Sequence, residues 1–202
     1  VYKRQDLISQ TSLGEHIKDY SFFFYNPEEA LHLSQREKAK AAECICNIEE
    51  ELRHAIDCHS QILISRYIEL LLDHCNRFYE RQFITRCEAN KKIMKKTDVL
   101  LKDYILSGKL KYNTSPSLGY CAKILQLSSH YFNDLLKFES GKNIDEYFES
   151  KRLEMAKSML LDSNNTVSVV TEKLGYPNIR YFSRLFKRIT GVAPNNYRLS
   201  QN

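Results

Sequence analysis

Several features that define other protein classes are scarce in or missing from this 202-residue sequence. It has no tryptophan, only 6 glycines and 4 prolines, and no run that would form a long flexible linker. No apolar stretch reaches the roughly 18–20 residues of a membrane span, and the N-terminus lacks the order of segments found in a signal peptide. The first residue is Val1 rather than Met, so we expect a fragment or a processed form.

Paired cysteines and recognisable catalytic groupings are also missing. The six cysteines, at positions 44, 46, 58, 75, 87 and 121, form no C-x-x-C pair, which favours reduced thiols in a cytoplasmic protein. His54 and Cys58 are four residues apart and could supply half of a zinc site, but two further ligands are lacking. Because no glycine-rich phosphate loop or Ser/His/Asp grouping stands out, we predict no enzyme activity, no metal and no cofactor.

Negative charge is absent from the end of the chain. No acidic residue follows Glu172, whereas six basic residues do: Lys173, Arg180, Arg184, Lys187, Arg188 and Arg198. Residues 1–110 hold 17 basic and 17 acidic residues, and residues 111–202 hold 13 and 8, so the whole net charge of +5 lies in the C-terminal part. A run of positive charge without any negative charge indicates a polyanionic partner. The alternative is that these basic residues form an ordinary solvated surface.

A short stretch near the C-terminus occurs twice, at an offset of 50 residues. The matching positions are aromatic, apolar, basic or glycine. They pair Tyr131, Phe132, Leu135, Lys137, Gly141 and Tyr147 with Tyr181, Phe182, Leu185, Lys187, Gly191 and Tyr197. At the same offset Lys123 pairs with Lys173 and Ile124 with Leu174. Two copies are too few for a solenoid, but they suit a partner with its own repeat, such as a DNA duplex.

The N-terminal part, residues 1–110, is predicted to be helical from about residue 34. Before that, the aromatic run Tyr20–Tyr25 has no helical period and predicts a strand or a buried extended segment. Ser34 and Glu37 form a capping-box signal for a helix over 34–57, and a second helix is predicted over 61–80. Each has an apolar seam with 4-3-4-3 spacing, which pairs either within the chain or between two chains as a dimer interface.

The border of the C-terminal part is predicted at the polar, turn-forming residues 109–117. Thr97 is predicted to cap a helix before it, and Gly108 to end that helix. Residues 111–202 then contain two helix-turn-helix units, at about 117–138 and 166–189, joined by a linker helix at about 143–162. The predicted caps of these helices are Ser117, Ser128, Asn143, Thr166 and Asn178. The predicted fold is therefore mainly α, with a short β remnant at Tyr20–Tyr25.

The second helix of such a unit enters the major groove, and its outward face carries the candidate DNA contacts. Arg180 and Arg184 are four residues apart and share a face, and Arg suits the two acceptors of guanine, as Asn133 suits adenine. Lys137, Lys187 and Arg188 suit phosphates. Asp134, on the first such helix, would repel phosphate or accept from cytosine.

Residues 112–199 resemble the C-terminal DNA-binding domain of AraC/XylS-type bacterial transcription regulators. The similarity is strongest over 167–198, where Gly175, Phe182, Phe186, Lys187, Gly191, Pro194, Tyr197 and Arg198 stand at the expected places. Thr171 departs from the small Ala usual in the family. By position, the resemblance implies base-reading sites at His130, Asn133, Ile179, Arg180, Ser183 and Arg184. The predicted phosphate contacts are Ser129, Lys137, Lys187 and Arg188.

The resemblance implies a sequence-specific regulator in the bacterial cytoplasm, located at the nucleoid when it is bound. Its expected partners are double-stranded promoter DNA and RNA polymerase, with a homodimer through residues 34–80. Residues 1–110 resemble, more weakly, the end of the family's sensor half; its β-barrel is absent from this sequence, so we expect any effector pocket to be missing or incomplete. The rival interpretation is a helical protein-binding module with a basic end for RNA or a membrane; the sequence lacks the repeated exposed aromatics of common RNA-binding sheets.

Overall fold

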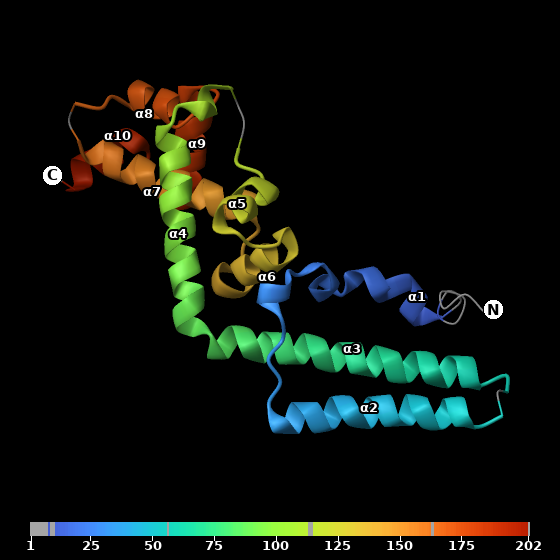
Figure 1. Cartoon of the computed structure of the whole chain (residues 1–202). Helices are drawn as coiled ribbons and strands as arrows, with labels where there is room; N and C mark the ends of the chain where they lie inside the picture. The colour runs from blue at the N-terminus through green and yellow to red at the C-terminus, as the bar shows by residue number, and fades with distance from the viewer. Residues whose placement is uncertain (1–7, 9–10, 56, 113–114, 163, 202) are drawn as a thin grey trace. The chain divides into compact units, whose positions relative to one another are not determined.

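The computed structural model describes residues 8, 11–55, 57–112, 115–162 and 164–201, and all regular structure within these ranges is helical (Figure 1). The contacts divide the chain into two compact units, Val1–Ala89 and Asn90–Asn202, which are described separately below. None of the helices in the described ranges is both long enough and apolar enough to cross a membrane.

The N-terminal unit is built on two long helices that lie side by side (Figure 1). α2 (Gln35–Arg53) begins at the predicted Ser34 capping box, and α3 (Ser60–Thr85) follows. Cys44, Ile64 and Phe78 are buried in this unit. Arg81 of α3 donates two hydrogen bonds, of 2.9 and 2.7 Å, to the carboxylate of Glu37 at the start of α2. α2 and α3 therefore pair within the chain, but Ile45 and Leu52 of the predicted α2 seam stay exposed, so that seam is not buried as a whole.

The predicted strand at Tyr20–Tyr25 is wrong. α1 (Ser12–His16) and the 3₁₀ helix η1 (Ile17–Asp19) come first, and Ser21–Phe24 then form a second 3₁₀ helix, η2. In the described part of the chain no strand is available for pairing, so the backbone closes local bonds instead, such as Phe23 N–H to Tyr20 O at 3.3 Å. Two of the aromatic rings pack on Tyr79 of α3: the ring centroid of Phe22 lies 5.5 Å from that of Tyr79, and the centroid of Tyr25 lies 5.1 Å from it. A third 3₁₀ helix, η3 (Pro27–Glu29), precedes α2.

α4 (Cys87–Leu106) is longer than predicted, and Thr97 does not begin it. The Thr97 side chain is buried in mid-helix, where its hydroxyl donates back to the Ile93 carbonyl at 3.0 Å. The preceding Lys and Met residues are good helix formers, so the helix continues through them. Gly108, with φ +75°, follows the helix as predicted. Leu101 and Ile105 of α4 join the C-terminal core, and the division between the two compact units falls between Ala89 and Asn90, in the first turn of α4.

The C-terminal unit contains both helix pairs and the helix between them. η4 (Lys109–Tyr112) precedes α5 (Leu118–Leu125) and α6 (Ser129–Ser140). α7 (Ile144–Leu161) leads to α8 (Val167–Lys173) and α9 (Ile179–Thr190). The sequence did not predict the final helix, α10 (Pro194–Gln201). The five predicted caps are confirmed, because Ser117, Ser128, Asn143, Thr166 and Asn178 each accept a backbone N–H with the side-chain oxygen.

One hydrophobic core runs through the whole C-terminal unit. α6 contributes Phe132 and Leu136, and α9 contributes Phe182 and Phe186 at the corresponding positions; all four are fully buried. α7 buries residues along its whole length, from Ile144 and Phe148 at its start to Leu160 near its end. Because these side chains belong to the same core, α7 fixes the two helix pairs relative to each other.

The two helix pairs are related by two offsets rather than one. The caps of the second helices, Ser128 and Asn178, differ by 50 residues, but the caps of the first helices, Ser117 and Thr166, differ by 49. The turns agree with this, since Leu127 N–H donates to Ala122 O, and Tyr176 N–H to Thr171 O, 49 residues later. Pro177 is the additional residue in the second turn.

The predicted pairs Lys123–Lys173 and Ile124–Leu174 are therefore wrong. The side chain of Leu174 is 1% exposed, whereas that of Ile124 is 52% exposed. The structural counterpart of Leu174 is Leu125, which packs against the core, and the counterpart of Ile124 is Lys173. An offset of 50 misplaced the first helices because the single inserted residue lies between them and the second helices.

The left-handed residue in each turn is a glycine only in the second copy. Gly175 has φ +67°, whereas its counterpart Gln126 has φ +59°, and Gln126 is the only non-glycine residue with positive φ in the described ranges. The left-handed conformation costs an L-residue roughly 1–2 kcal/mol, partly offset by the greater freedom of glycine in the unfolded chain. We expect Gln126→Gly to raise the free energy of unfolding by about 0.5–1 kcal/mol in urea titrations, and Gln126→Ala to leave it nearly unchanged. A destabilised Gln126→Gly variant would contradict this.

Candidate nucleic-acid interface

α9 exposes a strongly basic face opposite its buried Phe182, Leu185 and Phe186. Arg180, Arg184, Lys187 and Arg188 are exposed, Ile179 is 44% exposed, and Ser183 is half-buried. Arg184 and Arg188 line a recess of about 420 Å³ together with Tyr181 and Leu185. All six of the residues predicted on this helix therefore lie on its accessible side.

The cations of α9 have no acidic partner within the part of the chain that the structure describes. Arg180, Arg184, Lys187 and Arg188 take part in none of the ion pairs found there. Three guanidinium groups and one ammonium group are thus exposed on the accessible side of one helix. A face of this kind can donate to the oxygens of phosphates and to base edges without first breaking an internal salt bridge.

α6 presents a different face from the same position in the first helix pair. His130 and Lys137 are exposed, and Ser129, Asn133 and Asp134 are half-buried. The Asn133 side chain donates to the Asp134 carboxylate at 3.3 Å, so the two side chains hold each other. The predicted residues are brought together here too, but with a carboxylate among them, and the two helices therefore differ in charge.

Arg152 on α7 holds the turn that precedes α9, a role that no pattern in the sequence predicted. Its guanidinium donates to the Leu174 carbonyl at 3.1 and 2.7 Å and to Glu149 at 2.9 Å. It also lies 3.9 Å from the ring centroid of Tyr176, whose hydroxyl donates to Glu149 at 2.8 Å. Burial raises the pKa of Tyr176, so this hydroxyl stays a neutral donor. Arg152 thus ties the end of α8 and the turn to the linker helix.

Arg198 belongs to the basic run of the sequence but not to the exposed basic face. It is half-buried, and its guanidinium donates to the Leu160 carbonyl at 2.9 Å and to the Asn165 carbonyl. It therefore closes the end of α7 and the loop after it. Thr171, the departure from the family pattern, is buried with its hydroxyl donating to the Val167 carbonyl at 2.7 Å, so its polar group is satisfied.

The residues considered for metal or thiol chemistry do not assemble into a site. α2 ends at Arg53, so His54 and Cys58 do not share a helix face, and the described ranges contain no group of three or more His, Cys, Asp or Glu side chains placed to hold a metal ion. Burial raises the pKa of the Cys121 thiol to about 11. That thiol is therefore protonated near neutral pH and is a poor nucleophile.

Comparison with known proteins agrees with this geometry. Residues 121–200 match a family described as a helix-turn-helix domain. The HTH-type transcriptional regulator YobQ of Bacillus subtilis is 39% identical over 77 residues, which are 38% of this chain and 32% of YobQ. The raffinose operon transcriptional regulatory protein RafR of Pediococcus pentosaceus is 34% identical over 89 residues, which are 44% of this chain and 32% of RafR.

A solved structure, the C-terminal domain of the response regulator AraT from Geobacillus stearothermophilus, is 27% identical, covers 54% of this chain and 84% of its own, and has a TM-score of 0.43. From the helix order, the exposed helix faces and the matched relatives, the C-terminal unit is a helix-turn-helix domain. More narrowly, it is a domain of the AraC/XylS type, as the sequence predicted. The chain spans about a third of the length of YobQ and RafR.

Proposed function

We propose that this chain binds double-stranded promoter DNA at specific sequences and regulates transcription. The observation that carries the proposal is the pair of helix-turn-helix units around one core, with the unpaired cations of α9 on the accessible face of the second unit. In such units the second helix lies in the major groove. α6 and α9 are therefore the two reading helices, and α7 sets the distance between them.

Base reading and phosphate binding divide among the exposed residues by their chemistry. Arg180 and Arg184 suit guanine, Ile179 suits the thymine methyl group, and Ser183 donates or accepts according to the base. On α6, His130 and Asn133 are the proposed readers. The phosphate contacts are those whose side chains act as point charges or sit at a helix end: Ser129, Lys137, Lys187 and Arg188.

The asymmetry between α6 and α9 predicts an asymmetric site. α9 provides four exposed cations, whereas α6 has Asp134 bonded to Asn133 beside its readers. If both helices enter successive major grooves on one side of the duplex, their blocks of sequence lie about 10 base pairs apart. The block read by α9 should be the stronger of the two.

Selection of bound fragments from a random DNA pool, followed by sequencing, tests this proposal. Two unequal blocks about 10 base pairs apart are expected. A single block would show that α9 reads alone and that the first helix pair only supports it. No enrichment of any sequence would remove the proposal of specific binding and leave only charge-driven association.

Lys187→Ala should weaken binding to every sequence by a similar factor, because a lysine at a phosphate carries no sequence information. The slope of log affinity against log salt should fall by about 1. Titration of the selected site and of a scrambled duplex between 50 and 200 mM salt measures both quantities. Lys102→Ala, an exposed lysine on α4, serves as the control and should change neither. A loss confined to the selected site would show that Lys187 reads bases.

For the N-terminal unit we propose a homodimer through residues 34–80. Ile45 and Leu52 on α2 are 47% and 54% exposed, and Ile62 on α3 is 56% exposed, although the two helices already pair within the chain. Burying these side chains against a second copy would remove apolar area from water. Sedimentation at micromolar concentration tests this, and a monomer would remove it. Regulation at a promoter also implies RNA polymerase as a partner and the bacterial cytoplasm as the place of action.

A further inference from the structure

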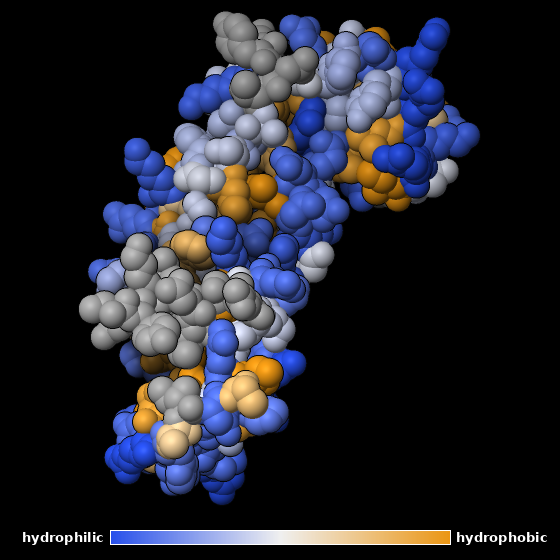
Figure 2. Space-filling model, turned by 90° about the vertical axis from the view of Figure 1, so that its right-hand side faces the viewer, coloured by the Kyte–Doolittle hydropathy of each residue, from blue (hydrophilic) through white to orange (hydrophobic). Residues whose placement is uncertain are grey.

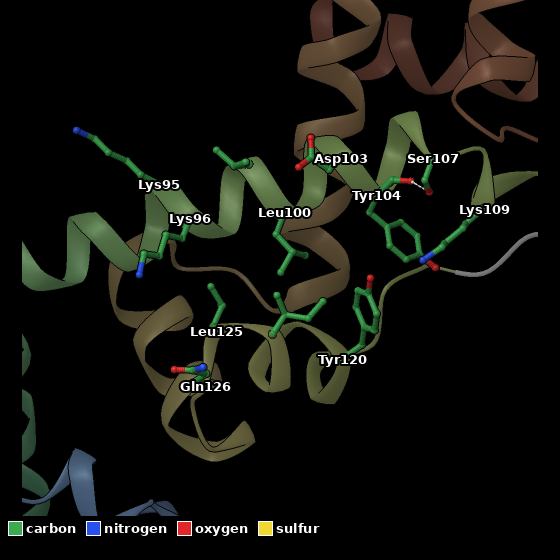
Figure 3. Close-up of a pocket in the computed structure, with 12 residues that line it drawn as sticks. Lys95, Lys96, Leu100, Asp103, Tyr104, Ser107, Lys109, Tyr120, Leu125 and Gln126 are labelled. Carbon is green, nitrogen blue, oxygen red and sulfur yellow. Dashed lines mark hydrogen bonds between the residues drawn. The ribbon is translucent and has the colours of Figure 1, made fainter.

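A groove of about 830 Å³ runs between the second half of α4 and α5, and none of its lining residues is a predicted DNA contact. Leu100 of α4 and Leu125 of α5 approach each other across it (Figure 3). Tyr104, Lys109 and Tyr120 gather at one end of the groove, and Lys96 and Gln126 line the other (Figure 3). All the lining residues belong to the C-terminal unit, so the groove is a feature of that unit alone.

The walls of the groove are apolar and open to water. Val99 on α4 is 59% exposed and Ile124 on α5 is 52% exposed. The surface view shows apolar side chains breaking the hydrophilic surface in several places (Figure 2). The second helix pair shows that the fold does not need an apolar residue at this position, because the counterpart of Ile124 there is Lys173. The apolar wall is therefore specific to the first helix pair.

The rim of the groove is positively charged. It carries Lys95, Lys96 and Lys109 and the single acidic residue Asp103. Lys109 stands over two aromatic rings, 5.5 Å from the centroid of Tyr104 and 5.7 Å from that of Tyr120. Among the residues that the structure describes, no ion pair involves Lys95 or Lys96. A partner that brings carboxylates to both edges and apolar side chains to the middle would complement this surface.

We propose that this groove is a docking site for an acidic amphipathic helix of a partner protein. A small molecule is usually enclosed by its pocket over 70–90% of its surface, and walls that are half exposed do not enclose one. A helix lying in an apolar groove needs only one buried face. The stretch of α4 from Lys95 to Leu106 is about 17 Å long, enough for roughly three turns of a partner helix. Nucleic acid would use the lysines but leave Val99 and Ile124 in water.

A labelled helical peptide with leucines at i, i+3, i+4 and i+7 and glutamates on both flanks is the probe, used with the full chain. Fluorescence anisotropy should show saturable binding, and a peptide with lysine in place of glutamate should bind at least about tenfold more weakly. Ile124→Lys, which installs the residue found in the other helix pair, should also weaken binding at least about tenfold because it removes apolar contact area, even though it adds a positive charge to the groove. Leu161→Lys, at another exposed apolar residue, should leave it unchanged.

Affinity for DNA separates this proposal from the proposed DNA-binding function. Ile124→Lys should bind the selected DNA site as the parent chain does, so that the peptide result stands whether or not DNA binding is specific. Absence of peptide binding, equal binding of the lysine peptide, or equal binding by Ile124→Lys would each overturn the proposal. It would also be overturned if Ile124→Lys lost DNA affinity in parallel, or converted a self-associated chain into a monomer, since the groove would then belong to the DNA or to a second copy.

Discussion

Gly175→Ala should lower the free energy of unfolding of the C-terminal unit by about 3 kcal/mol, combining a left-handed backbone with a steric clash. Gly175 has φ +67° in the turn between α8 and α9. A Cβ placed on it would lie 2.5 Å from Leu110 Cβ and 2.8 Å from the Leu110 carbonyl oxygen. The second of these atoms belongs to the backbone of η4, which cannot move aside as a flexible side chain would.

A matched control separates the two contributions. Gly141, at the end of α6, has φ +68°, but a Cβ there would have no atom within 4 Å. Gly141→Ala should therefore cost only the left-handed conformation, about 1 kcal/mol. Urea titration of both variants followed by circular dichroism gives the comparison. Equal losses for the two variants would show that η4 yields to the new methyl group and that the contact between Gly175 and Leu110 does not hold the turn.

The contact at Gly175 bears on function because the same turn leads directly into α9. Arg152 holds the turn from the side of α7 through the Leu174 carbonyl, and Leu110 of η4 touches it from another side. Two independent elements thus fix where α9 begins. A reading helix must be placed accurately to present its side chains to base edges, so Gly175→Ala is also expected to reduce specific DNA binding under conditions where the unit remains folded.

The helices and their caps could be predicted from the sequence because the signals are local. A Ser, Thr or Asn side chain bonds the backbone three residues ahead, and this needs no knowledge of the rest of the fold. The buried positions of α6 and α9 could be predicted for a similar reason, since Phe132 and Phe182 follow the helical period. The remaining positions of these two helices point outward, and they include the residues of the candidate interface.

The misplaced elements are mostly decided by distant contacts, and one is decided by helix propensity. Tyr20–Tyr25 resembled a strand, but the rings of Phe22 and Tyr25 pack against Tyr79 of α3 rather than against a neighbouring strand. Thr97 resembled a cap, but good helix formers before it extended α4 past it. The role of Arg152 depends on a carbonyl 22 residues away, and the burial of Arg198 on one 38 residues away. No sequence pattern predicts a hydrogen bond between residues separated by 22 or 38 positions.

The two copies of the repeat differ by one inserted residue, Pro177, and this insertion makes a single offset misalign part of the repeat. A single offset of 50 aligned the reading helices correctly, and the candidate readers depended only on these. The first helices align at an offset of 49. The offset of 50 therefore paired the buried Leu174 with the exposed Ile124. That pairing assigns Ile124 to the position of a buried leucine. Only the comparison of Ile124 with Lys173 shows that Ile124 is an exposed apolar residue in the wall of the groove.

Arg184→Ala should weaken binding to the selected DNA site by about 1–3 kcal/mol, or roughly 5- to 150-fold, and relax the preference at one base pair. Arg184 is exposed on α9, one turn from Arg180, and carries a planar fork of donors that matches the two acceptors of guanine. Affinities for the selected site and for all single-base variants of it measure both effects. Binding to a scrambled duplex should fall much less.

Arg184→Lys distinguishes the guanidinium fork from its charge. Lysine keeps the positive charge but lacks the rigid pair of donors, so this variant should retain the salt slope while losing most of the preference. Lys187→Ala should show the reverse pattern, with a lower slope and an unchanged preference. If Arg184→Ala and Lys187→Ala instead weaken every duplex by the same factor, both side chains contact phosphate, and the base reading by α9 must come from Ile179, Arg180 and Ser183.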